Sequence, residues 1–212
     1  MRKSIGLVLL VCGAAIAGDV GSTIQLPKPN IKGGMPLMQA LSERKSTRDF
    51  STEKLPAATL SNLLWAAYGQ NRPDGRRTAP SANNRQTVDI YAVLAEGAYL
   101  YQYKEHRLDM VASGDLRAAT GRQDFVGQAP LNLVYVADLA KIAGNSADDK
   151  LIYPAAETGF IGQNVYLFCA SEGLATVVRA MVDRDALGKA LKLRADQKII
   201  LSQTVGYPKR AQ

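Results

Sequence analysis

Apolar residues recur at helical spacing in four segments of the chain. These segments are residues 36–44, 55–68, 155–171 and 183–193. The first holds Leu37, Ala40 and Leu41 at positions i, i+3 and i+4, and we expect these side chains to form its buried face. Pro56 near the start of the second segment and Gly69 after its end are typical helix boundaries. The third segment is apolar around most of its circumference, which predicts burial on several sides.

Six other segments are rich in β-branched and aromatic residues and have the length of strands. They are residues 88–94, 98–103, 107–111, 131–136, 173–180 and 197–205. The second and third of these would form a hairpin with His106 at a solvent-exposed tip, and the fourth would be a second central strand. A short helix is also expected over residues 115–120, capped by Ser113 or Asp115.

The size and composition of the chain favour one globular domain. It has 212 residues, of which 47% are hydrophobic and 21% are charged, and we find no low-complexity tract or repeat. The net charge of +7 fits an anionic ligand or a nucleic acid. The cations are dispersed, however, and the clusters at residues 72–77 and 209–210 lie in no nucleic-acid-binding motif. A small phosphate-bearing ligand is therefore favoured over nucleic acid.

The scarcity of cysteine and histidine argues against several kinds of site. Cys12 and Cys169 cannot form a framework of disulfides, and Cys169 is predicted to be a small buried hydrophobic residue on a helix. His106 is the only histidine in the sequence. A Ser-His-Asp hydrolase or a metal site with several histidines is therefore not expected.

Residues 1–17 have the features of a secretory signal peptide: a basic start, an apolar run over 5–16 and small residues at a cleavage site. We therefore expect export, with the periplasm as the destination. The apolar run is shorter than the roughly 20 residues that span a membrane, so no stable span is expected after cleavage, while an uncleaved anchor stays open. Cys12 allows a lipoprotein, which Val11 disfavours because that signal needs a small residue there. Residues 18–34 are expected to be a linker or extended arm, and 35–212 the folded domain.

The candidate chemistry begins in Glu43–Phe50, where three cations and two hydroxyls follow the first predicted helix. Arg44, Lys45, Ser46 and Arg48 fall at the C-terminal exit of that helix, where they are free to converge on one anion the size of a phosphate. The alternative is that basic residues near a helix end only favour the negative end of its dipole.

Residues 44–50, Arg-Lys-Ser-Thr-Arg-Asp-Phe, resemble the N-terminal flavin-binding signature of the nitroreductase family. Three later segments resemble further marks of this family in the family order, and these are residues 80–86, 173–180 and 205–209. The stretch from 97 to 117 is similar to the branch that contains the azoline-oxidising enzymes of thiazole and oxazole biosynthesis. The resemblance implies an α+β fold with a mostly antiparallel central sheet flanked by helices, in an intertwined homodimer.

The resemblance also assigns residues to bound FMN. Those expected at its phosphate end are Arg44, Lys45, Ser46, Lys209 and Arg210. Those expected to reach the flavin across the dimer interface are Pro80, Ser81, Asn84 and Gln86. Arg48 is expected near N1 and O2 of the ring, and backbone N–H groups of Val177 and Val178 near N5 and O4. Arg179 is unusual for the family, and we expect it either to face solvent or to line the substrate side.

The implied activity is that of an FMN-dependent oxidoreductase, with ping-pong two-electron transfer between a reductant such as NAD(P)H and a small organic acceptor. The flavin carries the redox chemistry, so no side chain is expected to be catalytic. Two alternatives stay open. One is an exported flavin-binding protein without turnover, and the other is an FMN oxidase that does not use NAD(P)H, because an exported protein would not meet that pool.

Overall fold

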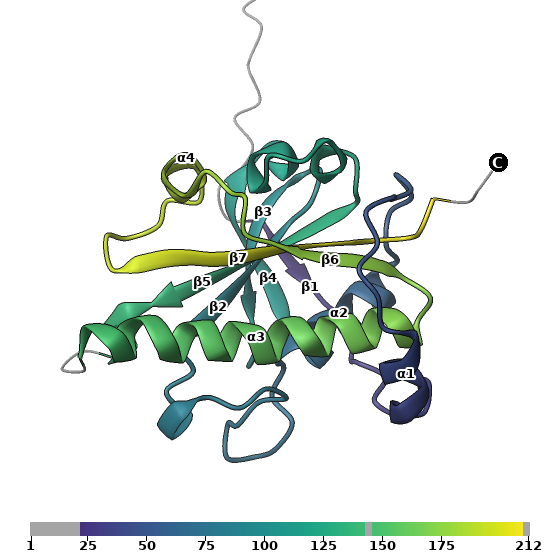
Figure 1. The fold of residues 1–212 in the computed structure, drawn as a ribbon, viewed down its shortest axis with the longest axis horizontal. Coiled ribbons are helices and arrows are strands. Elements are labelled where there is room, and N and C mark those ends of the chain that lie inside the picture. The colour runs from purple at the N-terminus through teal and green to yellow at the C-terminus, as the bar shows by residue number, and fades with distance from the viewer. Residues whose placement is uncertain (1–21, 143–145, 210–212) are drawn as a thin grey trace, which may run out of the picture.

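A computed structural model describes residues 22–142 and 146–209 of the chain. The expected signal peptide and Arg210 lie outside these residues. The described chain is an α+β fold built on one seven-stranded sheet, as expected (Figure 1). All strand pairings in this sheet are antiparallel.

The sheet has the strand order β1-β4-β3-β2-β5-β7-β6. The strands are β1 Thr23–Gln25, β2 Val88–Val93, β3 Gly97–Gln102, β4 Arg107–Ser113, β5 Leu131–Asp138, β6 Ala175–Arg179 and β7 Gln197–Gly206. All six predicted strands are present, and β5 is buried along its whole length between β2 and β7. The additional strand, β1, belongs to the expected linker or arm and pairs with β4 at the edge of the sheet.

Four α-helices cover the sheet on both faces. They are α1 Leu37–Glu43, α2 Ala57–Tyr68, α3 Ala147–Ser171 and α4 Arg184–Ala190. Figure 1 shows α2 and α3 on one face of the sheet and α4 on the other. The core is divided accordingly: Leu64 of α2 packs in one cluster with Ile161 of α3, and Leu187 of α4 packs in another with Val134 of β5. The helices thus sandwich the sheet.

The helix boundaries follow from local chemistry that the sequence shows in part. α2 starts after Pro56 and ends at Gly69, as predicted. α3 is longer than predicted: it starts after Ser146, whose hydroxyl accepts a hydrogen bond from the backbone N–H of Asp149 at 3.1 Å. Pro154 lies inside this helix. The predicted start at residue 155 was wrong. Proline usually ends a helical pattern, but here the helix continues through Pro154.

Three local predictions need correction. In α1 only Ala40 is buried, whereas Leu37 is 63% and Leu41 44% exposed in the single chain, so the predicted buried face is wrong. Residues 115–120 form only a 3-10 turn, Arg117–Thr120. His106 is half-buried rather than solvent-exposed, because its ring packs between two hydrogen-bonding side chains described below.

Among the helices of residues 22–142 and 146–209, none is both long enough and apolar enough to cross a bilayer.

Candidate functional site

A cavity of about 910 Å³ lies where the Arg44–Phe50 segment meets the C-terminal end of α3 and the start of β6. Its lining residues are Ser42, Glu43, Lys45, Ser46, Thr47, Arg48, Asp49, Tyr166, Cys169, Ala170, Gly173, Leu174, Ala175, Thr176 and Pro208. Three of the four segments that the sequence singled out, residues 44–50, 173–180 and 205–209, therefore line one cavity.

Backbone hydrogen bonds hold these three segments together. The N–H of Thr47 donates to the carbonyl of Thr176 on β6 at 2.9 Å. The N–H of Lys209 donates to the carbonyl of Asp49 at 3.1 Å, next to a β-bridge between Phe50 and Pro208. Because these ties use main-chain atoms, they fix the position of the segment and leave its polar side chains available to a ligand.

The cations of the segment surround the cavity. Lys45 and Arg48 line it and are exposed, and the half-buried Arg44 places its guanidinium over the ring of Tyr166, 5.3 Å from the centroid. Within the described residues, no carboxylate forms an ion pair with any of these three side chains. Glu43 also lines the cavity, as does Asp49. The cations are thus free to bind an anion at the cavity rim.

Tyr166 of α3 is a site residue that the sequence reasoning missed. Its hydroxyl lies 2.8 Å from Oγ of Ser46 and accepts a hydrogen bond from the backbone N–H of Val178 at 3.0 Å. The sequence could have indicated this role, because Tyr166 lies on an otherwise apolar helix and a buried or half-buried phenol usually finds a hydrogen-bond partner. Tyr166 therefore joins the Arg44–Phe50 segment to the edge strand β6.

The edge of β6 offers backbone donors in alternation. In an antiparallel ladder the N–H groups of successive residues point to opposite sides of the strand. The N–H of Val178 points away from β7, toward Tyr166, so that of its neighbour Val177 points toward β7. Within this chain neither of the two backbone donors predicted to face a flavin lines the cavity, because that of Val177 points toward β7 and that of Val178 is bonded to Tyr166.

The second predicted motif lies away from this cavity. Figure 1 shows the loop that follows α2 on the side of α3 opposite the sheet, away from the Arg44–Phe50 segment. None of the predicted residues in it, Pro80, Ser81, Asn84 and Gln86, lines the cavity. The loop is internally bonded: Oγ of Ser81 accepts from the N–H of Gln86 at 3.0 Å, and Nε2 of Gln86 donates to Oδ1 of Asn84 at 3.0 Å. Within one chain the motif is therefore ordered but separate.

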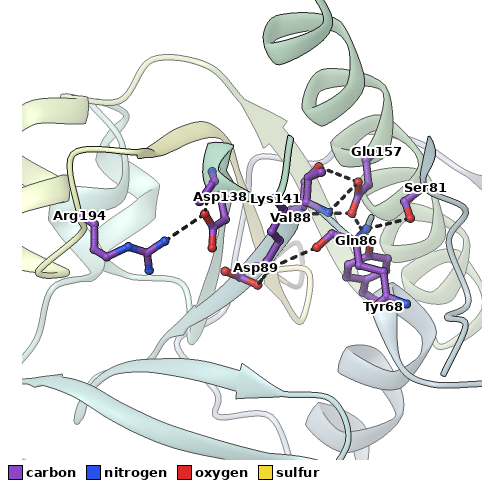
Figure 2. A network of polar contacts seen from close by, with 11 residues as sticks. Tyr68, Ser81, Gln86, Val88, Asp89, Asp138, Lys141, Glu157 and Arg194 are labelled. Atoms are coloured by element: carbon purple, nitrogen blue, oxygen red, sulfur yellow. Dashed lines mark hydrogen bonds and ion pairs between the residues drawn. The ribbon is translucent and has the colours of Figure 1, made fainter. Parts of the chain in front are cut away.

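A buried carboxylate, Glu157 of α3, anchors the end of this loop (Figure 2). It accepts hydrogen bonds from the hydroxyl and N–H of Thr87, from the N–H of Val88 at 3.1 Å, and from the hydroxyl of Tyr68. Burial, followed by the charge of Glu157, raises the pKa of the Tyr68 phenol well above its usual range, so this donor stays protonated. Glu157 thus ties α2, α3 and the start of β2 together.

Arg179 occupies neither of its two expected places. It is 5% exposed, and its guanidinium donates to the hydroxyl of Thr204 at 3.0 Å, the carbonyl of Thr120 at 2.8 Å and Oδ1 of Asn132 at 2.9 Å. It does not line the cavity. Gly121 allows this packing, because a Cβ at that position would lie 1.9 Å from Nη1 of Arg179. Burial lowers the pKa of Arg179 to about 10.

Cys169 is a buried free thiol, as predicted, and burial raises its pKa far above the usual range, so it is no thiolate nucleophile. No cluster of three or more His, Cys, Asp or Glu side chains in residues 22–142 and 146–209 is placed to hold a metal ion.

Comparison with known proteins identifies consistent similarities. The sequence profile of the Nitroreductase family matches residues 41–207. A protein of Methanocaldococcus jannaschii, provisionally named a nitroreductase, is 31% identical over 186 residues, which cover 82% of this chain and 93% of that protein. A crystal structure of a provisionally assigned nitroreductase from Ralstonia eutropha is 44% identical with a TM-score of 0.85 and covers 89% of this chain and 90% of its own.

The fold alone is shared with a more distant structure, the microcin synthetase complex of Escherichia coli. The similarity has a TM-score of 0.68 at 19% identity and covers 99% of this chain and 85% of the matched chain.

Proposed function

The chain belongs to the nitroreductase family of oxidoreductases, and on this premise we propose that it binds FMN and transfers two electrons in a ping-pong reaction. The proposed partners are a reductant such as NAD(P)H and a small organic acceptor. The observation that carries the proposal is the cavity in which three separate segments, each singled out by its sequence, meet around unpaired cations.

The residues of the cavity fit FMN in size and chemistry. Its volume of about 910 Å³ lies within the range of roughly 300–1,000 Å³ that is typical of small-molecule sites. A phosphate dianion needs cations and hydroxyls, and Ser46 lines the cavity, Arg44 packs over Tyr166 in its wall, and Lys209 is tied to the cavity-lining Asp49. The pyrimidine edge of a flavin needs donors, and the side chain of Arg48, which lines the cavity, supplies them.

In the proposed site the protein orients the cofactor and stabilises charge. Bound FMN supplies the two-electron redox chemistry itself. Arg44, Lys45, Ser46 and Lys209 hold the phosphate end, with Arg210 as a further candidate beyond the described residues. Arg48 provides a fixed positive charge where negative charge develops on reduction. No side chain is assigned a nucleophilic role.

We also propose that two copies of the chain associate through the outer face of α3. That face combines small residues with exposed large apolar ones, namely Leu151, Ile152, Ala155, Ala156, Gly159 and Phe160. They recur at i and i+4, so they form one stripe along the helix. A second copy would cover this stripe and bring its Pro80–Gln86 loop toward the first copy's cavity, which accounts for the separation of that loop from the cavity within one chain.

The dimer is tested by sedimentation velocity on wild type and on Phe160→Glu, because a charge in the centre of an apolar interface opposes association. Met181→Glu is the matched control, since Met181 is 59% exposed and is not part of α3. We expect a dimer for wild type and Met181→Glu, and a monomer for Phe160→Glu. A wild-type monomer at micromolar concentration would contradict the proposal.

For residues 1–17 we propose a signal peptide that directs the protein to the periplasm, followed by an arm over 18–34 and the FMN-binding domain over 35–212. The comparison of precursor and mature masses by mass spectrometry after expression tests this assignment. An intact N-terminus in a cytoplasmic fraction would contradict it.

FMN binding is tested by the absorption spectrum of the purified protein, with acid release and identification of any yellow chromophore. Arg48→Ala removes a cation that lines the cavity, Arg44→Ala removes the one over Tyr166 in its wall, and Lys189→Ala removes one on α4, outside it. We expect stoichiometric FMN in wild type and Lys189→Ala and a loss of FMN in the two arginine variants. A colourless protein that cannot be reconstituted with FMN would overturn the proposal. Bound FMN that is neither reduced by NAD(P)H nor reoxidised by a quinone would favour binding without turnover.

A further inference from the structure

Arg77 is a buried cation whose Nε has no hydrogen-bond acceptor among the described residues. It is 8% exposed, and its guanidinium carbon lies 3.5 Å from the ring centroid of Tyr103 and 4.2 Å from that of Tyr68. Its Nε is buried and has no partner, and no described residue forms an ion pair with its side chain. The two rings enclose its charge. Stacking holds the guanidinium but satisfies none of its N–H groups.

The buried carboxylate of Glu157 forms no ion pair with Arg77. Glu157 already accepts hydrogen bonds from Tyr68, Thr87 and Val88. Arg77 acts on this group only across the Tyr68 phenol, whose OH points to Glu157 and whose ring faces the guanidinium. Buried donors without acceptors are rare in native proteins and call for a partner that the chain itself does not provide.

Arg77 lines a cavity of about 210 Å³ that is suited to such a partner. Arg85 and Lys141 also line it, and the single carboxylate in its wall, Asp89, forms an ion pair with Lys141 at 3.0 Å. Because Arg77 has no ion-pair partner among the described residues, the wall carries an uncompensated positive charge. Tyr101 belongs to an apolar part of the lining made by β2 and β3. The site thus combines a cationic end with an apolar wall.

The size of the cavity limits what it binds. At about 30 Å³ per water molecule, 210 Å³ corresponds to roughly seven waters. This is below the roughly 300 Å³ at which small-molecule sites begin, so a flavin or nicotinamide nucleotide does not fit. The cavity shares no lining residue with the larger one beside Arg44–Phe50.

We propose that this cavity binds a compact oxyanion, either the carboxylate of a small organic acid or inorganic phosphate, with Arg77 as the main donor and Lys141 as the second. A guanidinium presents parallel N–H groups that match two oxygens of one anion, and stacking between two rings fixes its plane in advance. Gln86, which lines the cavity and belongs to the Pro80–Gln86 loop, places the bound anion beside that loop. The proposal does not depend on FMN.

The test is isothermal titration of the full chain at pH 7 with sodium phosphate and, separately, with sodium butyrate, at an ionic strength matched with chloride. We expect one of the two probes to bind saturably, with one anion per chain. The probe that binds shows whether the site takes a carboxylate or phosphate. Lys141→Gln should weaken binding about tenfold, which corresponds to about 1.4 kcal/mol of binding free energy. Arg77→Gln should abolish binding. Arg76→Gln is the matched control, because Arg76 is an exposed neighbour paired with Asp74 outside the cavity, and it should bind as wild type does.

Several results would overturn the proposal. These are the absence of saturable binding of both probes to wild type, unchanged affinity in folded Arg77→Gln, and an equal loss in Arg76→Gln. If Arg77→Gln does not fold, Lys141→Gln decides, since Lys141 is partly exposed and its removal leaves the core intact. Undiminished affinity in Lys141→Gln would then refute the site.

Discussion

The hydroxyl of Tyr166 accepts a hydrogen bond from the backbone N–H of Val178 at 3.0 Å, so the helix α3 occupies the outward donor of the edge strand β6. The same hydroxyl lies 2.8 Å from Oγ of Ser46 and has its own proton available for it. One phenol therefore sets the distance between β6 and the cation-bearing segment across the cavity.

Removal of this hydroxyl should loosen the proposed cofactor site. In Tyr166→Phe, Ser46 loses its partner, and a single hydrogen bond of this kind contributes about 0.5–1.5 kcal/mol. We expect FMN to bind about 2- to 12-fold more weakly, as measured by quenching of flavin fluorescence. Tyr153→Phe on the same helix is the control, since Tyr153 does not line the cavity. Unchanged or tighter binding in Tyr166→Phe would mean that the phenol only covers the N–H of Val178.

The carboxylate of Glu157 is essential for the packing of α3 on the sheet. In Glu157→Gln an amide NH₂ replaces one oxygen and meets N–H or O–H donors that have no other acceptor. An unsatisfied buried group costs about 1–3 kcal/mol, so we expect the free energy of unfolding to fall by that amount in urea titrations. Glu172→Gln, at the exposed end of the same helix, should change it by less than about 0.5 kcal/mol. Equal stabilities would contradict the assigned role.

His106 should make stability depend on pH near neutrality. The hydroxyl of Ser61 donates its proton to the carbonyl of Pro27 at 2.5 Å. Oγ of Ser61 therefore accepts a hydrogen bond from Nε2–H of His106, and Nδ1 of His106 accepts one from the hydroxyl of Tyr101. Burial lowers the pKa of His106 below 6.5, which means that the folded chain prefers the neutral ring. The stabilisation is therefore complete above pH about 6.5 and is lost as the pH falls through the lowered pKa.

The measurement is the urea midpoint between pH 7.5 and 5.5, where carboxylates remain ionised. We expect the midpoint of wild type to fall toward pH 5.5 and that of His106→Asn to stay nearly level. Because His106 is the only histidine, the comparison isolates one group. A parallel decline in both proteins would assign the pH dependence elsewhere.

Gly121 and Gly159 should respond to alanine in opposite directions. A Cβ on Gly121 would lie 1.9 Å from Nη1 of Arg179 and displace a guanidinium that joins β5, β7 and the turn at Thr120. We expect Gly121→Ala to lose about 1–3 kcal/mol in denaturant titrations. Within one chain Gly159 in α3 has nothing within 4 Å of its ideal Cβ, so Gly159→Ala in the monomeric Phe160→Glu background should gain about 0.5–1 kcal/mol. A neutral Gly121→Ala would show that Arg179 has room to move.

Elements with strong local signals could be predicted from the sequence. The strands over β2, β5 and β7, and α2 between Pro56 and Gly69, follow from periodicity and helix-boundary residues alone. The predictions failed where a partner distant in sequence decides the outcome. His106 is held by Ser61, which lies 45 residues away, and the burial of Arg179 depends on Thr204 and Asn132. No local pattern encodes such contacts.

The candidate site was predictable to a similar degree. The resemblance placed the Arg44–Phe50 segment, β6 and Lys209 together, and they meet at one cavity or its rim. The sequence reasoning missed Tyr166 and Glu157, since an isolated polar residue on an apolar helix does not reveal what it bonds to. It also could not tell that Arg77 is enclosed by Tyr68 and Tyr103, because those rings come from α2 and the end of β3.

The position of β7 between β5 and β6 has a consequence for biosynthesis. About sixty residues separate the end of β5, Leu131–Asp138, from the start of β7, Gln197–Gly206. During translation β5 therefore leaves the ribosome well before β7. Until β7 is present, one edge of a strand that is buried along its whole length lacks its hydrogen-bonding neighbour, and such edges invite pairing with other chains. The sheet can therefore close only after the last strand of the chain has been made.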